Sequence, residues 1–411
     1  MKTAPSHSKN GSDAVRLVEI RGGLGGVPGL RMAGVHAGIK KRKTDLALLA
    51  FDGPRVCAAI HTMNDIKAAP LLVSAEHIAE DGDAMQALVC NAGCANACTG
   101  ERGIRDARAS ARQAAGLLGI RATQVIVAST GVIGVPLPMD RLSKGIERAV
   151  KDLDEGTEAG YDAAEAIMTT DHVPKIASYA FYEGEKRYVV AGIAKGSGMI
   201  NPALATMLSF IATDAPMSSV ALRAALSAAA EESFNMICVD GDMSTNDAVY
   251  AFAVPGAGDA PAGFTEALTA VCRDLAMAIV SDGEGATKTL TMQVTGAIDV
   301  AQARAVAHSI VSSSLVKTAI HGEDPNWGRV VCMAGAARVG VKDGIWAIWL
   351  NGVQWVERGA IEVLAEVEAH RLLEGKTVHI RLDLGLGDAH ATAWGCDLSS
   401  QYVRINAHYR T

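Results

Sequence analysis

The stretch Lys195–Ala215 reads KGSGMINPALATMLSFIATDA and lies at the centre of the 411-residue chain. Small and turn-forming residues continue up to Ala205, and Thr206 then opens an apolar run. The glycines and the proline of the first part allow close approach of the backbone and strained geometry. The apolar run is typical of a buried strand, so this pattern alone predicts a turn that leads into a strand.

Around this stretch, Ala-rich segments alternate with segments rich in β-branched residues, and the alternation predicts an α/β fold. The predicted helices cover residues 106–118, 141–153, 162–168, 217–234, 265–280, 300–312 and 361–369. The predicted strands cover residues 125–128, 178–182, 187–193, 290–294, 345–350, 377–386 and 391–396. The same texture repeats on a smaller scale near the end of the chain. We therefore expect a main α/β domain over residues 13–290 and a smaller α/β domain over residues 291–411.

The composition limits the classes of partner. Lys plus Arg is 38 and Asp plus Glu is 45, so the net charge is −7, which argues against a nucleic-acid or membrane-surface protein. No apolar run approaches the roughly 20 residues that a membrane helix needs. The segment Met1–Asp13 has neither the apolar core of a secretory signal nor the pattern of a transit peptide. Eight scattered cysteines indicate free thiols in a reducing compartment, so we expect a cytoplasmic protein.

Metal and cofactor motifs are incomplete. Cys90, Cys94 and Cys98 match neither a zinc site nor a common iron–sulfur pattern, and we expect them to be small packing residues. The segment His321–Asp324 (HGED) contains potential ligands but lacks the HExxH spacing. The glycine-rich segments 21–29 and 195–198 complete no dinucleotide-binding or phosphate-binding motif. We therefore expect no metal and no bound cofactor.

Thr206 could serve as a nucleophile only if a base activates its hydroxyl. One known arrangement places the threonine at a chain N-terminus, where its own α-amine acts as the base. The pKa of such an amine is about 7.7–8.0, close to working pH. An internal threonine would have to be released by cleavage of the Ala205–Thr206 bond. The pattern itself leaves two interpretations open, namely a self-released nucleophile and a plain turn before a buried strand.

The chain resembles the glutamate N-acetyltransferase (ornithine acetyltransferase) family of arginine biosynthesis. The segment ALATMLSFIATDA, preceded by AKGSGMI, is similar to the self-cleaving segment of that family. Further similar segments occur in the family's order: KAAP (67–70), NACTG (96–100), ASTGVIG (128–134), AIMTTD (166–171), SDGEGATK (281–288), EDPNWGR (323–329) and YVRINAHYRT (402–411). The resemblance covers the chain from about residue 20 to its last residue.

The resemblance implies a fold and a maturation step. The fold is a layered α/β sandwich of the ornithine acetyltransferase and DmpA-like type, with a smaller C-terminal α/β domain whose tail returns to the active site. Cleavage between Ala205 and Thr206 would give an α chain of residues 1–205 and a β chain of residues 206–411. The two chains stay associated in the family, and we expect a heterotetramer of two α and two β chains.

The resemblance also implies an activity. Thr206 would attack the Ala205 carbonyl, and water would hydrolyse the resulting ester and free the Thr206 amine. The mature enzyme would then move the acetyl group of N2-acetyl-L-ornithine to L-glutamate through an acetyl-enzyme, in a ping-pong scheme. Whether acetyl-CoA also serves as donor stays open, because family members divide on this point. Two alternatives are a related N-terminal-Thr amidohydrolase or aminopeptidase, and an uncut homologue that only binds a metabolite.

Both half-reactions pass through a tetrahedral oxyanion, which requires fixed hydrogen-bond donors. The resemblance assigns these donors to Thr130 and Gly131, which closely follow the predicted strand over residues 125–128. That strand would give the donors a rigid mounting. Without the resemblance, a simple turn after a strand would explain the same two residues.

The charges of the substrate call for a cation and an anion in its pocket, because N2-acetylornithine carries a carboxylate and an ammonium. The resemblance assigns these roles to Lys195 and Glu284. The family's other polar substrate contacts correspond to one of Thr169 and Thr170, of which we favour Thr169, and to Asn406 and Thr411.

Overall fold

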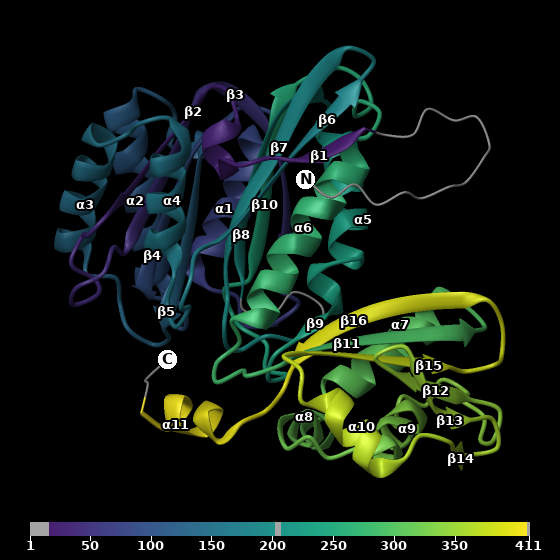
Figure 1. Ribbon diagram of the computed structural model, residues 1–411. Coiled ribbons are helices and arrows are strands. Elements are labelled where there is room, and N and C mark those ends of the chain that lie inside the picture. The colour runs from purple at the N-terminus through teal and green to yellow at the C-terminus, as the bar shows by residue number, and fades with distance from the viewer. Residues whose placement is uncertain (1–15, 202–206, 409–411) are drawn as a thin grey trace.

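A computed structural model describes residues 16–201 and 207–408 of the chain. The predicted cleavage bond between Ala205 and Thr206 and the predicted substrate contact Thr411 lie outside these residues. The described part contains two β-sheets, of nine and seven strands, with helices packed against each (Figure 1).

The first sheet has the strand order β1-β6-β7-β8-β10-β3-β4-β5, and β2 pairs with β3 beside this path. Its strands are β1 (Leu17–Glu19), β2 (Leu30–Val35), β3 (Leu46–His61), β4 (Met85–Cys94), β5 (Val125–Val132), β6 (Lys175–Glu183), β7 (Lys186–Lys195), β8 (Leu208–Met217) and β10 (Ala248–Pro255). The long strand β3 joins the two parts of the sheet, because its first half pairs with β2 and β4 and its second half pairs with β10.

Helices cover both outer faces of this folded sheet, so its layers run helix, sheet, sheet, helix (Figure 1). On one side α2 (Gly100–Leu118) and α3 (Met139–Lys151) share a core with β2 to β5. On the other side α5 (Ser219–Glu231) and α6 (Phe264–Ser281) share a core with β6 to β8 and β10. A third core fills the space between the two parts of the sheet. This arrangement confirms the predicted layered α/β sandwich.

Two more helices pack against the first sheet. The helix α1 (Ala69–Asp81) packs beside β5 and α2, and α4 (Gly156–Ile167) packs on β2, β3 and β7. Short 3-10 turns stand at Gly23–Gly26, Ala122–Gln124 and Phe234–Met236. Among the described residues, no helix combines the length and the apolar character that crossing a membrane requires.

The spacing of apolar residues explains these layers. The buried residues of α3 recur at helical spacing and make one face, which consists of Leu142, Gly145, Ile146 and Ala149. Strand β7 alternates instead, because successive side chains of a strand point to opposite faces. Its residues Val190 and Ala194 join the core under α5 and α6, and Val189, Ala191 and Ile193 join the inner core.

Strands β7 and β8 are antiparallel neighbours inside the first sheet, and Lys195 lies opposite Leu208. β8 also pairs in parallel with β10, where Leu208 lies opposite Ala248. The predicted buried strand after Thr206 is therefore confirmed as β8. The strand that precedes the predicted cleavage bond is the direct partner of the strand that follows it.

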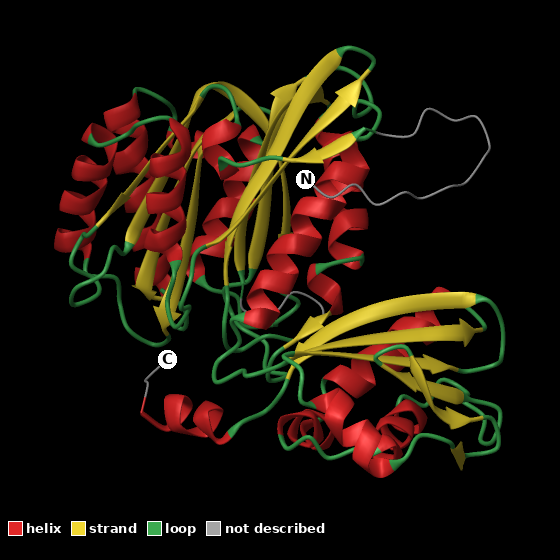
Figure 2. Ribbon diagram, viewed as in Figure 1, coloured by secondary structure: helices red, strands yellow, loops and turns green. Residues whose placement is uncertain are grey.

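The second sheet has the order β14-β13-β12-β15-β11-β16-β9, and its strands are labelled in Figure 1. Figure 2 shows this sheet in yellow with red helices beside it. Its strands are β9 (Ile237–Cys238), β11 (Thr289–Ala297), β12 (Ala347–Leu350), β13 (Val353–Glu357), β14 (Ile361–Glu362), β15 (Thr377–Asp383) and β16 (Ala389–Cys396). The helices α7 (Val300–Val311), α8 (Ser314–His321), α9 (Trp327–Ala336) and α10 (Glu366–Leu373) share its core. β9 comes from within the predicted main domain, and the predicted limit at residue 290 falls inside β11.

Some predicted elements differ in type or length. The predicted helix over residues 361–369 is wrong at its start, because Ile361 and Glu362 pair with β13 before α10 begins at Glu366. Pairing at the sheet edge here overrides local helical spacing. The predicted strand over residues 125–128 continues to Val132, because its pairing with β4 extends past Gly131.

Candidate active site

A pocket of about 160 Å³ lies where loops that connect elements of the first sheet and its helices meet the last helix, α11 (Ser400–His408). It brings together all the predicted site residues that the structure describes: Thr130, Gly131, Thr169, Thr170, Lys195, Glu284 and Asn406. These residues come from β5, the loop after α4, the end of β7, the loop after α6, and α11. Figure 1 shows α11 reaching from the second sheet back toward the ends of β4 and β5.

Lys195 ends strand β7 and is the buried cation of this pocket, with 3% of its surface exposed. Its ammonium Nζ lies 3.5 Å from Oγ1 of Thr130. Burial lowers the pKa of Lys195, because the charged form loses its hydration, and the negative charge of Asp171 opposes the shift. The pocket therefore places the side-chain amine of Lys195 beside Thr130, one of the two predicted oxyanion donors.

Asp171 fixes two walls of the pocket at once. Its Oδ2 accepts the backbone N–H of Thr169 at 2.9 Å, and its Oδ1 accepts the backbone N–H of Gly196 and the Lys175 ammonium, both at 2.7 Å. Burial acts to raise the pKa of Asp171, but the charges of Lys195 and Lys175 outweigh it and hold the pKa below its ordinary value. Asp171 was not predicted as a site residue, although it ends the segment AIMTTD.

Lys40 supports the same wall from the other side. Its ammonium donates to the carbonyl oxygens of Met168 at 2.6 Å and Thr44 at 2.8 Å. Burial lowers the pKa of Lys40 to about 8, and the charge of Asp45 opposes this shift. The peptide group between Met168 and Thr169 is thus held at both ends, by Lys40 from a distant segment and by the nearby Asp171.

Gly131 has a backbone conformation that other residues rarely adopt, with φ at +129°. A Cβ atom there would lie 2.3 Å from the carbonyl carbon of Gly93 on the neighbouring strand β4. The β4–β5 register is also irregular between Gly93 and Cys94. The strand therefore bends at Thr130–Gly131, which both line the pocket.

Asn246 braces the strand just before this bend. Its side-chain amide donates to the carbonyl oxygens of Ser129 at 2.8 Å and Ala95 at 2.7 Å. Asn246 is buried and lines the pocket. It lies in the Asp-rich and Gly-rich loop over residues 239–247, where the sequence singled out no individual residue.

Glu284 is the buried anion of the pocket and is 5% exposed. Its Oε2 accepts the side-chain amide of Asn406 at 2.8 Å, and its backbone N–H donates to the carbonyl of Ser197. A Cβ atom on Gly198 would lie 2.5 Å from the Glu284 carboxyl group. The glycine in KGSG thus allows the carboxylate to approach the segment that follows Lys195.

Asp240 joins the C-terminal helix to the segment before the predicted cut. Its carboxylate accepts the backbone N–H of Met199 at 2.6 Å and of Ile200 at 2.8 Å, and the Tyr402 hydroxyl at 3.2 Å. Burial raises the pKa of Asp240, because the charged form loses its hydration. Asp240 and Tyr402 both line the pocket, and the sequence did not identify either.

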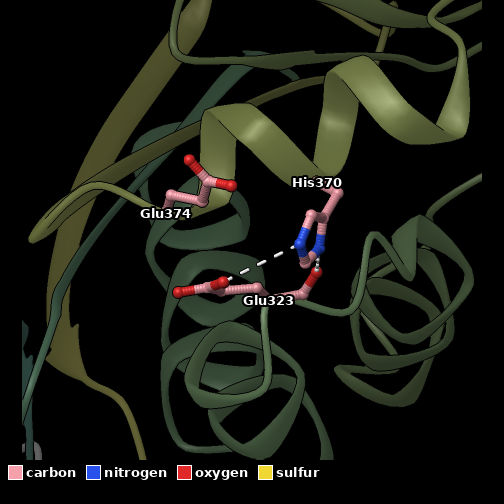
Figure 3. A group of neighbouring side chains, drawn as sticks. All are labelled: Glu323, His370 and Glu374. Carbon is pink, nitrogen blue, oxygen red and sulfur yellow. Dashed lines mark hydrogen bonds and ion pairs between the residues drawn. The ribbon is translucent and has the colours of Figure 1, made fainter.

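Outside this pocket, Glu323, His370 and Glu374 have the donor types of a metal site (Figure 3). One ligand atom from each lies within 4.8 Å of the others. Glu323 already pairs with Lys288 at 2.6 Å, and His370 Nδ1 bonds to the Glu323 carbonyl oxygen at 2.8 Å. Within this group, Glu323 and His370 connect the loop before α9 to α10.

All eight cysteines are free thiols. Cys90 and Cys94 are buried, as expected of packing residues. The prediction is wrong for Cys98, which is exposed and has a φ of +57° in a loop after β4.

The fold and the pocket together define an α/β enzyme with two β-sheets and a small pocket lined by a buried lysine, a buried glutamate and the irregular end of strand β5. The model of the ArgJ family matches residues 31–411, and the chain belongs to the ArgJ family.

Its curated relatives are similar over nearly their whole length. The chain is 46% identical over 404 residues to the arginine biosynthesis bifunctional protein ArgJ of Symbiobacterium thermophilum, covering 95% of this chain and 99% of that protein. It is 45% identical over 395 residues to the protein of the same name from Thermotoga neapolitana, covering 93% and 99%.

Two solved structures are also similar. The arginine biosynthesis bifunctional protein ArgJ of Bacillus halodurans is 37% identical and covers 47% of this chain and 100% of its own, with a TM-score of 0.45. The ornithine acetyltransferase of Mycobacterium tuberculosis, complexed with ornithine, is 40% identical with the same coverage and a TM-score of 0.42.

Proposed function

We propose that this protein transfers the acetyl group of N2-acetyl-L-ornithine to L-glutamate in arginine biosynthesis. Membership of the ArgJ family and the names of the relatives support this reaction. The observation that carries the proposal is the pocket, which is lined by residues from five separate segments of the chain.

Maturation comes first in this proposal. The Thr206 hydroxyl attacks the Ala205 carbonyl carbon, the peptide C–N bond breaks, and the Thr206 amine takes up a proton. Water then hydrolyses the ester, which leaves a carboxylate on Ala205 and restores the hydroxyl. The free amine can now act as the base for the same hydroxyl.

The pocket offers complementary partners for the substrates. In this proposal Lys195 binds the carboxylate of N2-acetylornithine, and Glu284 binds its ammonium in place of the Asn406 amide.

The acetyl transfer follows this binding. The hydroxyl oxygen of Thr206 takes the acetyl group, Thr130 and Gly131 stabilise the oxyanion, and ornithine leaves with the proton of that hydroxyl. The amine of glutamate then attacks the acetyl carbon, the ester bond to Thr206 breaks, and the proton lost by the amine returns to the Thr206 oxygen. Thr169, favoured over Thr170, and Thr411 complete the proposed polar contacts.

The proposal also covers a second acetyl donor, the cell compartment and the assembly of the mature enzyme. The relatives are named bifunctional, which supports acetyl-CoA as a second acetyl donor. The free cysteines support a reducing compartment such as the cytoplasm. We assign the mature enzyme two α and two β chains, with no metal or resident cofactor.

The test is an assay of purified protein with N2-acetylornithine, with and without glutamate, read by mass spectrometry. We expect ornithine and N-acetylglutamate in equal amounts when glutamate is present. A denaturing gel should show two bands near half of the full mass of 42.7 kDa. Acetate in place of N-acetylglutamate would mean a hydrolase, and a single full-length band without turnover would mean a binding protein.

A further inference from the structure

Met207, the first described residue after the predicted cut, is held at both of its backbone groups. Its N–H donates to Oδ1 of Asp247 at 3.1 Å, and its carbonyl oxygen accepts the N–H of Ala248 at 3.1 Å. Met207 itself is buried, with 1% of its surface exposed. Two consecutive residues, Asp247 and Ala248, therefore hold the peptide group before Met207 and the peptide group after it, at the start of β8.

Asp247 is an unusual residue for this purpose. It is fully buried, and its backbone carbonyl is tied to the N–H of Thr62 at 2.9 Å. Its second carboxyl oxygen, Oδ2, has no hydrogen-bond partner among the residues that the structure describes. Burial raises the pKa of Asp247 well above its ordinary value, and the charge of Lys195 opposes this shift. Burying a carboxyl group is costly, so a simple packing role would be better filled by an apolar or amide side chain.

We propose that Asp247 is a positioning residue for self-cleavage and for acetyl transfer, acting through the backbone N–H of Met207. This inference rests on the proposed function, in which Thr206 is the nucleophile. The nitrogen of Met207 is bonded to the carbonyl carbon of Thr206, and the peptide group that joins them is planar. We call the hydrogen bond from the Met207 N–H to Asp247 the clamp. Because the clamp holds this planar group, only a few rotatable bonds remain between it and the hydroxyl oxygen of Thr206.

The size of the effect follows from how steeply acyl transfer depends on alignment. A misplacement of about 1 Å can cost about 100-fold in rate. The clamp exists before the cut and does not depend on the bond that is broken. It therefore serves first the cleavage and then the acetyl transfer, with the same atoms.

The test compares three Asp247 variants and one control variant of the full-length chain with the wild type. Asp247→Asn keeps an oxygen that can accept from Met207, whereas Asp247→Ala and the polar Asp247→Ser cannot reach it. Asp259→Ala, at an exposed aspartate in the loop after β10 that does not line the pocket, is the matched control. The rate of appearance of the two chains is followed on denaturing gels, and thermal unfolding reports the fold.

We expect Asp247→Asn and Asp259→Ala to be cleaved within about fivefold of the wild-type rate. We expect Asp247→Ala and Asp247→Ser to be cleaved at least 100-fold more slowly. In the fraction that matures, kcat should fall with the KM for N2-acetylornithine unchanged. If Asp247→Ala fails to fold, the folded Asp247→Ser protein decides the result.

Two results would overturn the inference. Wild-type cleavage rates in Asp247→Ala or Asp247→Ser would remove the positioning role. Loss of cleavage in Asp247→Asn, equal to that in Asp247→Ala, would assign Asp247 to proton transfer instead. A wild-type chain that is never cut would contradict the proposed function itself, which is a distinct outcome.

Discussion

The ammonium of Lys195 lies 3.5 Å from the hydroxyl of Thr130, and both residues are buried. One contact therefore links the cation of the pocket to the strand bend proposed to bind the oxyanion. The carboxylate of Asp171, through the N–H of Gly196, holds the residue that follows this lysine. The position of the positive charge is thus set by backbone and side chains together, as electrostatic stabilisation of a transition state requires.

Thr206→Ala should remain a single band at 42.7 kDa and show no acetyl transfer, because it lacks the attacking hydroxyl. Thr206→Ser keeps the hydroxyl, and we expect it to be cut and active at a reduced rate. Denaturing gels and the N2-acetylornithine assay measure both properties. Normal cleavage of the alanine variant would assign the nucleophile to another residue.

Gly131→Ala should be both less stable and nearly inactive. Its Cβ atom would lie 2.3 Å from the Gly93 carbonyl carbon, at a φ of +129°, so the backbone must move. We expect a loss of about 1–3 kcal/mol in the free energy of unfolding and at least 100-fold in kcat. Urea unfolding and steady-state kinetics provide the measurements.

The matched control for this glycine is Gly116→Ala, within helix α2. Nothing lies within 4 Å of its added Cβ atom, and alanine favours a helix over glycine. We expect unchanged activity and a gain of about 0.5–1 kcal/mol in stability. If the two variants behave alike, the conformation of Gly131 is not the reason for its presence.

Glu284→Gln should raise the KM for N2-acetylornithine about tenfold, because an ionised partner for the ammonium becomes neutral. The new amide still fits beside Asn406, so the fold should be kept. Asp242→Asn also removes a carboxylate from the pocket lining, at an exposed position, and should change KM less than twofold. Equal increases in KM in both variants would mean that the total negative charge of the pocket matters, rather than a direct contact between the substrate and Glu284.

The histidine side chain of His308 should lower the free energy of unfolding of the protein in mild acid. Burial lowers its pKa to about 4, against about 6.5 in an unfolded chain. Between these two values the unfolded chain binds a proton that the folded chain does not, so stability is present above pH 6.5 and is lost as pH falls toward 4. From pH 7 to pH 5, the wild type should lose about 1–2 kcal/mol more than His308→Gln. Urea unfolding at both pH values tests this, and equal losses would contradict it.

The strands and helices with clear periodicity could be predicted from the sequence, together with the pocket residues that stand in recognisable segments. Asp171, Asp240, Asn246 and Tyr402 could not, because their roles arise from contacts between distant parts of the chain. Tyr402 reaches Asp240 across 162 positions, and Asn246 reaches Ala95 across 151. No local pattern encodes such a contact, since a buried carboxylate or amide resembles any loop residue until its partner is known.

The same limit explains the elements that were missed or altered. The bend in β5 depends on its neighbour Gly93, and the short strand β14 depends on β13. In each case the sequence neighbours permit several conformations, and pairing with a remote strand selects one. Residues 206 and 130 could be proposed as partners from the motifs alone, but the clamp on Met207 required a structure.

The ladder between β7 and β8 runs from the pair Val190–Thr213 to the pair Lys195–Leu208. If the backbone is severed between these strands, the ladder joins two separate polypeptides, and each fragment completes the other's sheet. Neither fragment could bury its open strand alone, so each should aggregate when it is produced by itself. Synthesis as one precursor, followed by scission after folding, would give every fragment its partner at once. Gel filtration under native conditions should then show the assembled protein and neither fragment by itself, although denaturant separates the two fragments.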